Sequence, residues 1–127
     1  MKKYAFALAA CLVFVVSQAQ LKPIAYTDAA QKLNGVAAIP SKSLKNKPGI
    51  LILPAWKGID NHARESATQL AALGYYAFVA DIYGEGNYPA NTDEAGKRSG
   101  FYKKHYDQYQ RRIQLALDQL VKSGANP

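Results

Sequence analysis

The sequence predicts an α/β fold, a three-layer sandwich in which helices cover both faces of a sheet that contains parallel strands. Three consecutive segments support this prediction: an apolar run at residues 50–53, an amphipathic segment at 60–73 and a second apolar run at 75–80. A continuous apolar run is typical of a strand that is covered on both faces. A strand, a helix and a parallel strand with short connections form a βαβ unit.

The elements on either side of the first apolar run follow from local patterns. Residues 23–27 and 33–39 are predicted to be two strands of a hairpin, joined by a turn at 28–31. Asp60 or Asn61 can cap the first helix, because a short polar side chain there accepts a hydrogen bond from a free backbone N–H. The small and apolar residues that share one face of this helix are Ala63, Ala67, Leu70 and Ala71.

The second half of the domain is predicted to contain a loop and one long helix. Gly, Pro and Asn make residues 82–91 a loop. The helix is predicted to run from Asp93 or Ser99 to Lys122. The residues predicted to form its buried stripe are Tyr102, Tyr106, Tyr109, Ile113, Leu117 and Leu120.

Residues 1–19 are predicted to be a secretory signal peptide, and residues 20–127 the mature domain. The segment consists of the positive start Met1-Lys2-Lys3, the apolar run from Tyr4 to Val16 and the small-residue site Ser17-Gln18-Ala19. The apolar run is shorter than the ~20 residues that span a bilayer. We therefore expect an exported protein, periplasmic or secreted, with no stable membrane span after signal cleavage.

Cys11 offers an alternative to this processing. Leu8-Ala9-Ala10-Cys11 has the form of a lipoprotein cleavage site, but most of the apolar run would then stay on the mature chain. Cys11 is also the only cysteine of the protein. The mature domain is therefore expected to have no disulfide, no catalytic thiol of its own and no Cys-based metal site.

The formal charge of +7 falls to +5 without Lys2 and Lys3, because 14 of the 16 basic residues then stand against 9 acidic ones. The remaining excess is scattered and lacks a nucleic-acid-binding motif. We therefore predict a solvated basic surface and no nucleic-acid partner. The residues that carry this charge include Lys42, Lys45, Lys47, Lys97, Arg98, Lys103, Lys104, Arg111 and Arg112.

The ordinary signs of a complete active site are missing from the sequence. No Gly-x-Ser-x-Gly or Gly-x-Cys-x-Gly elbow occurs, and Ser66 and Ser99 lie on predicted helices. His62 and His105 are interpreted as solvent-facing helix residues, and their spacing does not suggest zinc. The Gly84-x-Gly86 pair lacks the third glycine of a dinucleotide fingerprint. No cofactor and no metal are implied.

The turn after the first apolar strand is the most informative segment for function. Ligands of open α/β sheets bind outside the carboxyl ends of the strands, where this turn and the loop after Asp81 are predicted to lie. Backbone N–H groups in such a turn can form half of an oxyanion hole. The alternative is a plain connection in which Trp56 packs as a lid on the core, and the spacing leaves both interpretations open.

The order of several motifs resembles that of the dienelactone hydrolases and their carboxymethylenebutenolidase-like relatives, over about residues 23–122. The motifs that carry the resemblance are Pro48-Gly49 before the apolar strand, Trp56-x-Gly58-Ile59, Ala63-Arg64, the stretch from Gln69 to Tyr75, and Ala80-Asp81-Ile82-Tyr83-Gly84-x-Gly86. The resemblance implies the N-terminal half of an α/β-hydrolase fold and an enzyme that cleaves lactones or carboxylic esters.

The resemblance also implies a Cys or Ser nucleophile, an Asp and a His, all of which lie after residue 127 in that family. The chain is therefore expected to be inactive alone and to act on a small ester or lactone only when completed. By analogy the backbone N–H of Trp56 would help to hold the oxyanion, with Lys57 and Tyr83 as substrate contacts at the rim. Many members carry Glu where this chain has Ala55, so the nucleophile and the substrate stay open.

A second hypothesis comes from a different class of protein. The chain would then be a non-catalytic exported α/β domain that binds a small ligand at the edge formed by Trp56 and Tyr83.

Overall fold

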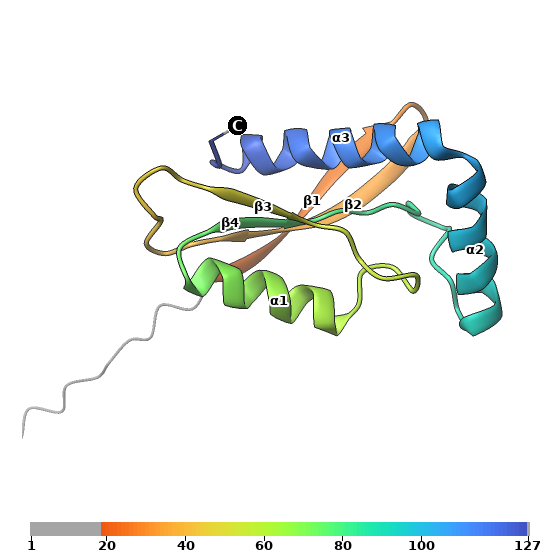
Figure 1. Ribbon diagram of the computed structural model, residues 1–127, viewed down its shortest axis with the longest axis horizontal. Coiled ribbons are helices and arrows are strands. Elements are labelled where there is room, and N and C mark those ends of the chain that lie inside the picture. The colour runs from red at the N-terminus through yellow and green to blue at the C-terminus, as the bar shows by residue number, and fades with distance from the viewer. Residues whose placement is uncertain (1–18, 127) are drawn as a thin grey trace, which may run out of the picture.

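The computed structural model describes residues 19–126, so the predicted signal peptide lies outside the described residues except for Ala19. A sheet lies between α1 on one face and α3 on the other, which confirms the three-layer α/β prediction (Figure 1). The elements are β1 (Gln20–Asp28), β2 (Gln31–Ile39), β3 (Gly49–Ile52), α1 (Asn61–Ala72), β4 (Tyr76–Val79), α2 (Thr92–Lys104) and α3 (Tyr106–Lys122). None of the helices in this part of the chain is long and apolar enough to cross a membrane.

The sheet is mixed, with the strand order β1-β2-β4-β3. β3 and β4 pair in parallel, as the βαβ pattern predicts, while β2 pairs antiparallel with both β1 and β4. The predicted hairpin is confirmed, but its strands extend further, because only Ala29 and Ala30 form the turn. β3 lies at the edge of the described sheet and is half-buried, with Leu51 packed on the α3 face and Ile52 on the α1 face.

The first helix begins and ends as its sequence predicts. The side chain of Asp60 accepts a hydrogen bond of 2.9 Å from the backbone N–H of Ala63, which caps α1. The face that packs on the sheet is made of Ala63, Ala67 and Ala71. Because these side chains are small, the helix backbone can approach β2 and β4 closely.

The predicted single long helix is wrong, because the chain breaks at His105 into α2 and α3. His105 has a ψ of 62°, outside the helical range, and its ring stacks on Phe101 at 3.8 Å between centroids. Its Nδ1 also lies 2.8 Å from the Phe101 carbonyl oxygen. The backbone bends at His105, and the axes of α2 and α3 point in different directions (Figure 1).

The predicted buried stripe is also wrong in part. Tyr106 and Leu117 are 62% and 39% exposed, whereas the buried residues of α3 are Arg112, Ala116 and Leu120. Because the helix breaks at His105, the residues of α3 that face the core cannot be counted at helical spacing from Tyr102. An arginine then occupies a core-facing position.

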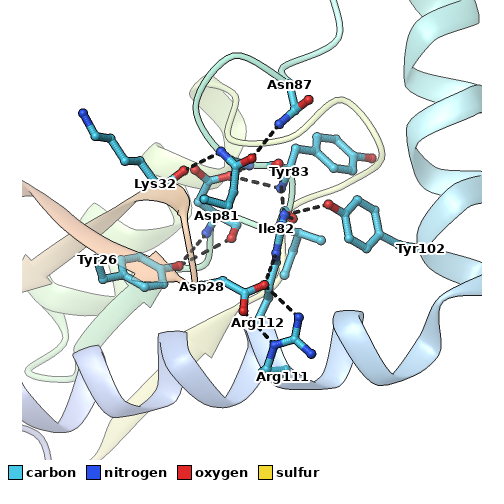
Figure 2. Close-up of polar contacts among 12 residues, drawn as sticks. Tyr26, Asp28, Lys32, Asp81, Ile82, Tyr83, Asn87, Tyr102, Arg111 and Arg112 are labelled. Atoms are coloured by element: carbon cyan, nitrogen blue, oxygen red, sulfur yellow. Dashed lines mark hydrogen bonds and ion pairs between the residues drawn. The ribbon is translucent and has the colours of Figure 1, made fainter.

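Arg112 is 3% exposed and is a buried exception to the predicted solvated basic surface. Its Nε donates to Asp28 at 3.0 Å, at the end of β1. Its Nη1 donates to the carbonyl oxygens of Ile82 and Tyr83 at 2.6 and 3.0 Å, and to the hydroxyl of Tyr102 at 2.6 Å (Figure 2). One guanidinium thus joins β1, the loop after β4, α2 and α3.

Arg111 binds the same carboxylate from the solvent side. Its Nε and Nη2 donate to the two oxygens of Asp28 at 2.6 and 3.2 Å, while its own side chain is 53% exposed. The hydrogen bond from Arg111, together with the one from Arg112, holds the pKa of the Asp28 carboxyl below its usual value despite desolvation by burial. Asp28 is therefore an ionised partner of both arginines.

We expect Arg112→Met to lower the free energy of unfolding by about 3–5 kcal/mol, because one partner of a buried ion pair is removed while several acceptors lose their donor. Arg111→Met is the matched control, and its effect should be much smaller because the side chain is exposed. Urea unfolding followed by circular dichroism measures both. Equal losses in the two variants would contradict a central role for Arg112.

The lowered pKa of Asp28 also predicts a pH dependence of stability. Because the pKa is lower in the folded than in the unfolded chain, the stabilisation is present above the ordinary value of 3.8 and is lost as the pH falls further. We expect the free energy of unfolding to decrease on acidification below about pH 4, and less steeply in Asp28→Asn. Urea titrations at a series of pH values test this, and parallel pH profiles for the two proteins would refute it.

Candidate functional site

A cavity of about 470 Å³ lies beside the carboxyl ends of β3 and β4. This is the edge of an open α/β sheet at which ligands bind. Its walls come from the turn after β3, from the loop after β4, and from α2 and the start of α3. The lining residues are Pro54, Ala55, Trp56, Gly58, Ile82, Tyr83, Ser99, Tyr102, Lys103, Tyr106 and Tyr109.

A β-turn from Ala55 to Gly58 forms one side of the cavity. The N–H of Gly58 donates to the carbonyl oxygen of Ala55 at 2.8 Å. Neither Trp56 nor Lys57 has a positive φ, which excludes the type II and primed turns and indicates type I. Gly58 itself has a φ of 83° and packs against the ring of Tyr83, so a side chain there would be strained.

The backbone of this turn presents free hydrogen-bond donors. Among residues 19–126, the N–H groups of Trp56 and Lys57 donate to no protein acceptor. The side chain of Trp56 is 44% exposed and does not pack as a closed lid on the core. A residue that lines the cavity thus has a backbone N–H without a protein acceptor, as the oxyanion interpretation requires.

The structure brings Tyr83 to this turn but separates Lys57 from the cavity. Tyr83 is 5% exposed and lies in the wall, whereas the sequence suggested the rim. Its hydroxyl donates to the carbonyl oxygen of Trp56 at 2.6 Å. Burial raises the pKa of the Tyr83 hydroxyl, so the group stays a protonated donor at neutral pH. Lys57 is exposed and is not among the residues that line the cavity.

The loop after β4 is shaped by the buried carboxylate of Asp81 (Figure 2). One oxygen accepts from the backbone N–H groups of Tyr83 and Gly84 at 3.1 and 2.9 Å. The other accepts from the N–H of Asn34 at 2.8 Å and the hydroxyl of Tyr88 at 2.7 Å. These four bonds give a physical reason for the Asp-x-Tyr-Gly motif, because the carboxylate fixes the backbone of the next residues.

The backbone of Asp81 is held as well. Its N–H donates to the hydroxyl of Tyr26 at 3.1 Å. Burial raises the pKa of Tyr26 to about 12, so the neutral hydroxyl persists. Tyr26 and Asn34 belong to the β1–β2 hairpin, and no local pattern predicts their contact with a loop some fifty residues away.

The aromatic wall on α2 and α3 is a feature that sequence reasoning missed. The helical spacing predicts a buried stripe that includes Tyr102, Tyr106 and Tyr109, but all three line the cavity. The ring centroids of Tyr83 and Tyr102 are 5.6 Å apart, and those of Tyr102 and Tyr109 are 6.4 Å apart. Tyrosines at helical spacing are the available signal, but the same spacing occurs in a buried core stripe and in the wall of a pocket.

The described residues contain no assembled catalytic group. His62 and His105 are exposed, and Ser66 lies on α1 away from the cavity. Ser99 lines the cavity, but its hydroxyl donates to the carbonyl oxygen of Gly96 at 3.1 Å and contacts no base. Within residues 19–126, no group of three or more His, Cys, Asp or Glu side chains could hold a metal ion.

Comparison with solved structures supports the α/β architecture. A dienelactone hydrolase-like promiscuous phosphotriesterase from metagenomic libraries matches with a TM-score of 0.74 and 28% identity, over 82% of this chain and 43% of that chain. A protein named m3DLH matches with a TM-score of 0.67 and 31% identity, over 80% of this chain and 42% of that chain. The chain thus spans less than half the length of either solved protein.

Comparison of the sequence with curated proteins gives no match. The model of the dienelactone hydrolase family matches residues 33–126, which include the Trp56 turn, the Asp81 loop and both helices of the aromatic wall. Together with the solved structures, this match confirms the resemblance that the motifs indicated. The chain belongs to the dienelactone hydrolase family.

Proposed function

We propose that this chain is the N-terminal part of an exported hydrolase of carboxylic esters or lactones, in which the backbone N–H of Trp56 is one of the oxyanion donors. The observation that carries the proposal is the free N–H of Trp56 beside a cavity at the carboxyl ends of the parallel strands. Membership of the dienelactone hydrolase family supports the reaction class. The apolar segment at residues 4–16 supports export.

In the proposed reaction a Cys or Ser nucleophile attacks the carbonyl carbon of the ester, and a His accepts its proton with an Asp orienting the imidazole. These three residues would come from sequence beyond residue 127. The carbonyl oxygen becomes negatively charged in the tetrahedral intermediate, and donors that already point at it stabilise that charge. The imidazolium then gives this proton to the leaving alcohol, and the same His activates the water that hydrolyses the acyl-enzyme.

The cavity supplies the rest of the proposed site within this chain. Its lining is largely aromatic and apolar, with the hydroxyl of Ser99 and the ammonium of Lys103 among the few polar groups. Such a lining suits a small, mostly apolar ester. The ring of Tyr83 would contact the substrate from the wall, and Lys57, which is exposed and does not line the cavity, would contact it only at the rim.

The first test compares the 127-residue chain with the product of the reading frame that follows it. We expect a Gly-x-[Cys/Ser]-x-Gly elbow downstream and hydrolysis of p-nitrophenyl acetate only by the longer protein, because the nucleophile is supplied there. Release of p-nitrophenol measures the activity, and diethyl p-nitrophenyl phosphate is a second substrate suggested by the phosphotriesterase relative. Turnover by the short chain above a heat-killed control would overturn the proposal. A stop codon with no downstream elbow would favour the non-catalytic binding domain.

The second test removes the proposed donor itself. Trp56→Pro deletes the N–H, and proline suits the first central position of a type I turn. In the full-length protein we expect kcat to fall by about 10²–10³-fold, the usual cost of losing one oxyanion donor. Trp56→Ala, which keeps the N–H, is the matched control for loss of the ring and should retain most of kcat. Equal activity of the two variants would exclude this donor.

A further inference from the structure

The central peptide of the Ala55–Gly58 turn joins Trp56 to Lys57. In β-turns this peptide has two opposite orientations, which distinguish type I from type II. Rotation from one to the other reverses the Trp56 carbonyl and the Lys57 N–H, while the turn hydrogen bond from Gly58 to Ala55 stays in place. The turn bond therefore holds the peptide that carries the Trp56 N–H, but it does not by itself hold the central peptide.

Within residues 19–126, one hydrogen bond from outside the turn holds the central peptide. The hydroxyl of Tyr83 donates to the Trp56 carbonyl oxygen at 2.6 Å, across 27 residues of sequence. The peptide before Trp56 is held by the Gly58–Ala55 bond at 2.8 Å. Both peptide planes that flank the Trp56 Cα are thus held, so neither backbone dihedral of Trp56 can change without breaking a hydrogen bond.

The donor that fixes the turn is itself rigid. The backbone N–H of Tyr83 donates to Asp81 at 3.1 Å, and its carbonyl oxygen accepts from Arg112 at 3.0 Å. Its ring packs beside Tyr102 and is nearly fully buried. A hydroxyl held in this way loses little further freedom when it bonds to the turn, which makes it an effective positioning group.

We propose that Tyr83 is a positioning residue of the hydrolase, whose hydroxyl holds the Trp56–Lys57 peptide at the cavity wall and so fixes the position of the turn that carries the free Trp56 N–H. This inference rests on the proposed function. Because an oxyanion donor stabilises the developing charge best from a fixed position, a turn that loses this bond to the wall moves more freely and donates less effectively. The loss would appear in the chemical step and leave ground-state binding nearly unchanged.

Tyr83→Phe tests the inference, because it removes the hydroxyl and keeps the buried ring. In the full-length protein we expect kcat for p-nitrophenyl acetate to fall about 10-fold while KM changes by less than about twofold. Tyr75→Phe is the matched control: its hydroxyl makes no hydrogen bond among residues 19–126, and it precedes β4 at the opposite end from the site. A rise in KM with kcat unchanged would assign the Tyr83 hydroxyl to substrate binding and overturn the positioning role.

A second measurement does not depend on activity. In ¹⁵N relaxation experiments on the same protein, Tyr83→Phe should lower the order parameters of the Trp56 and Lys57 amides, while Tyr75→Phe should leave them unchanged. Unaltered order of both amides in Tyr83→Phe would overturn the inference. If the full-length protein hydrolyses neither p-nitrophenyl substrate, the proposed function fails, whereas the relaxation data still decide whether Tyr83 fixes the turn.

Discussion

The structure depends on the buried guanidinium of Arg112. A charged group that is 3% exposed is tolerated only where its donors are used, and here they reach Asp28, two carbonyl oxygens and the hydroxyl of Tyr102. The contact brings the end of the β1–β2 hairpin, the loop after β4 and both C-terminal helices to one point. An apolar side chain at this position would fill space but would give the loop no defined orientation.

From this point a series of directed hydrogen bonds leads to the surface. Arg112 donates to the carbonyl oxygen of Tyr83, and Asp81 accepts from the backbone N–H of Tyr83. Tyr83 in turn reaches the turn that bears Trp56. The turn and the loop at the carboxyl ends of the parallel strands therefore take their geometry from buried charge in the core.

The elements that local patterns determine could be predicted from the sequence, and those that depend on distant partners could not. Asp60 caps α1 by accepting a hydrogen bond from Ala63, three positions along the chain. The apolar runs of β3 and β4 can be recognised as strands from their composition. The break at His105 and the burial of Arg112 depend on packing between segments far apart in sequence. For the same reason the Trp56 turn could be recognised as part of the site, whereas the aromatic wall and the bond from Tyr83 required the fold.

The pairing of Asp28 with Arg112 spans 84 residues of sequence, and this has a consequence for the order of folding. The β1–β2 hairpin forms from neighbouring residues, but closing so long a loop carries an entropic cost that only later contacts repay. A ribosome that adds about 5–20 residues per second needs roughly 4–17 s to extend the chain from Asp28 to Arg112. We therefore expect the hairpin to open and close reversibly until α3 has been synthesised. The pairing of Asp28 with Arg112 then stabilises the hairpin within the domain.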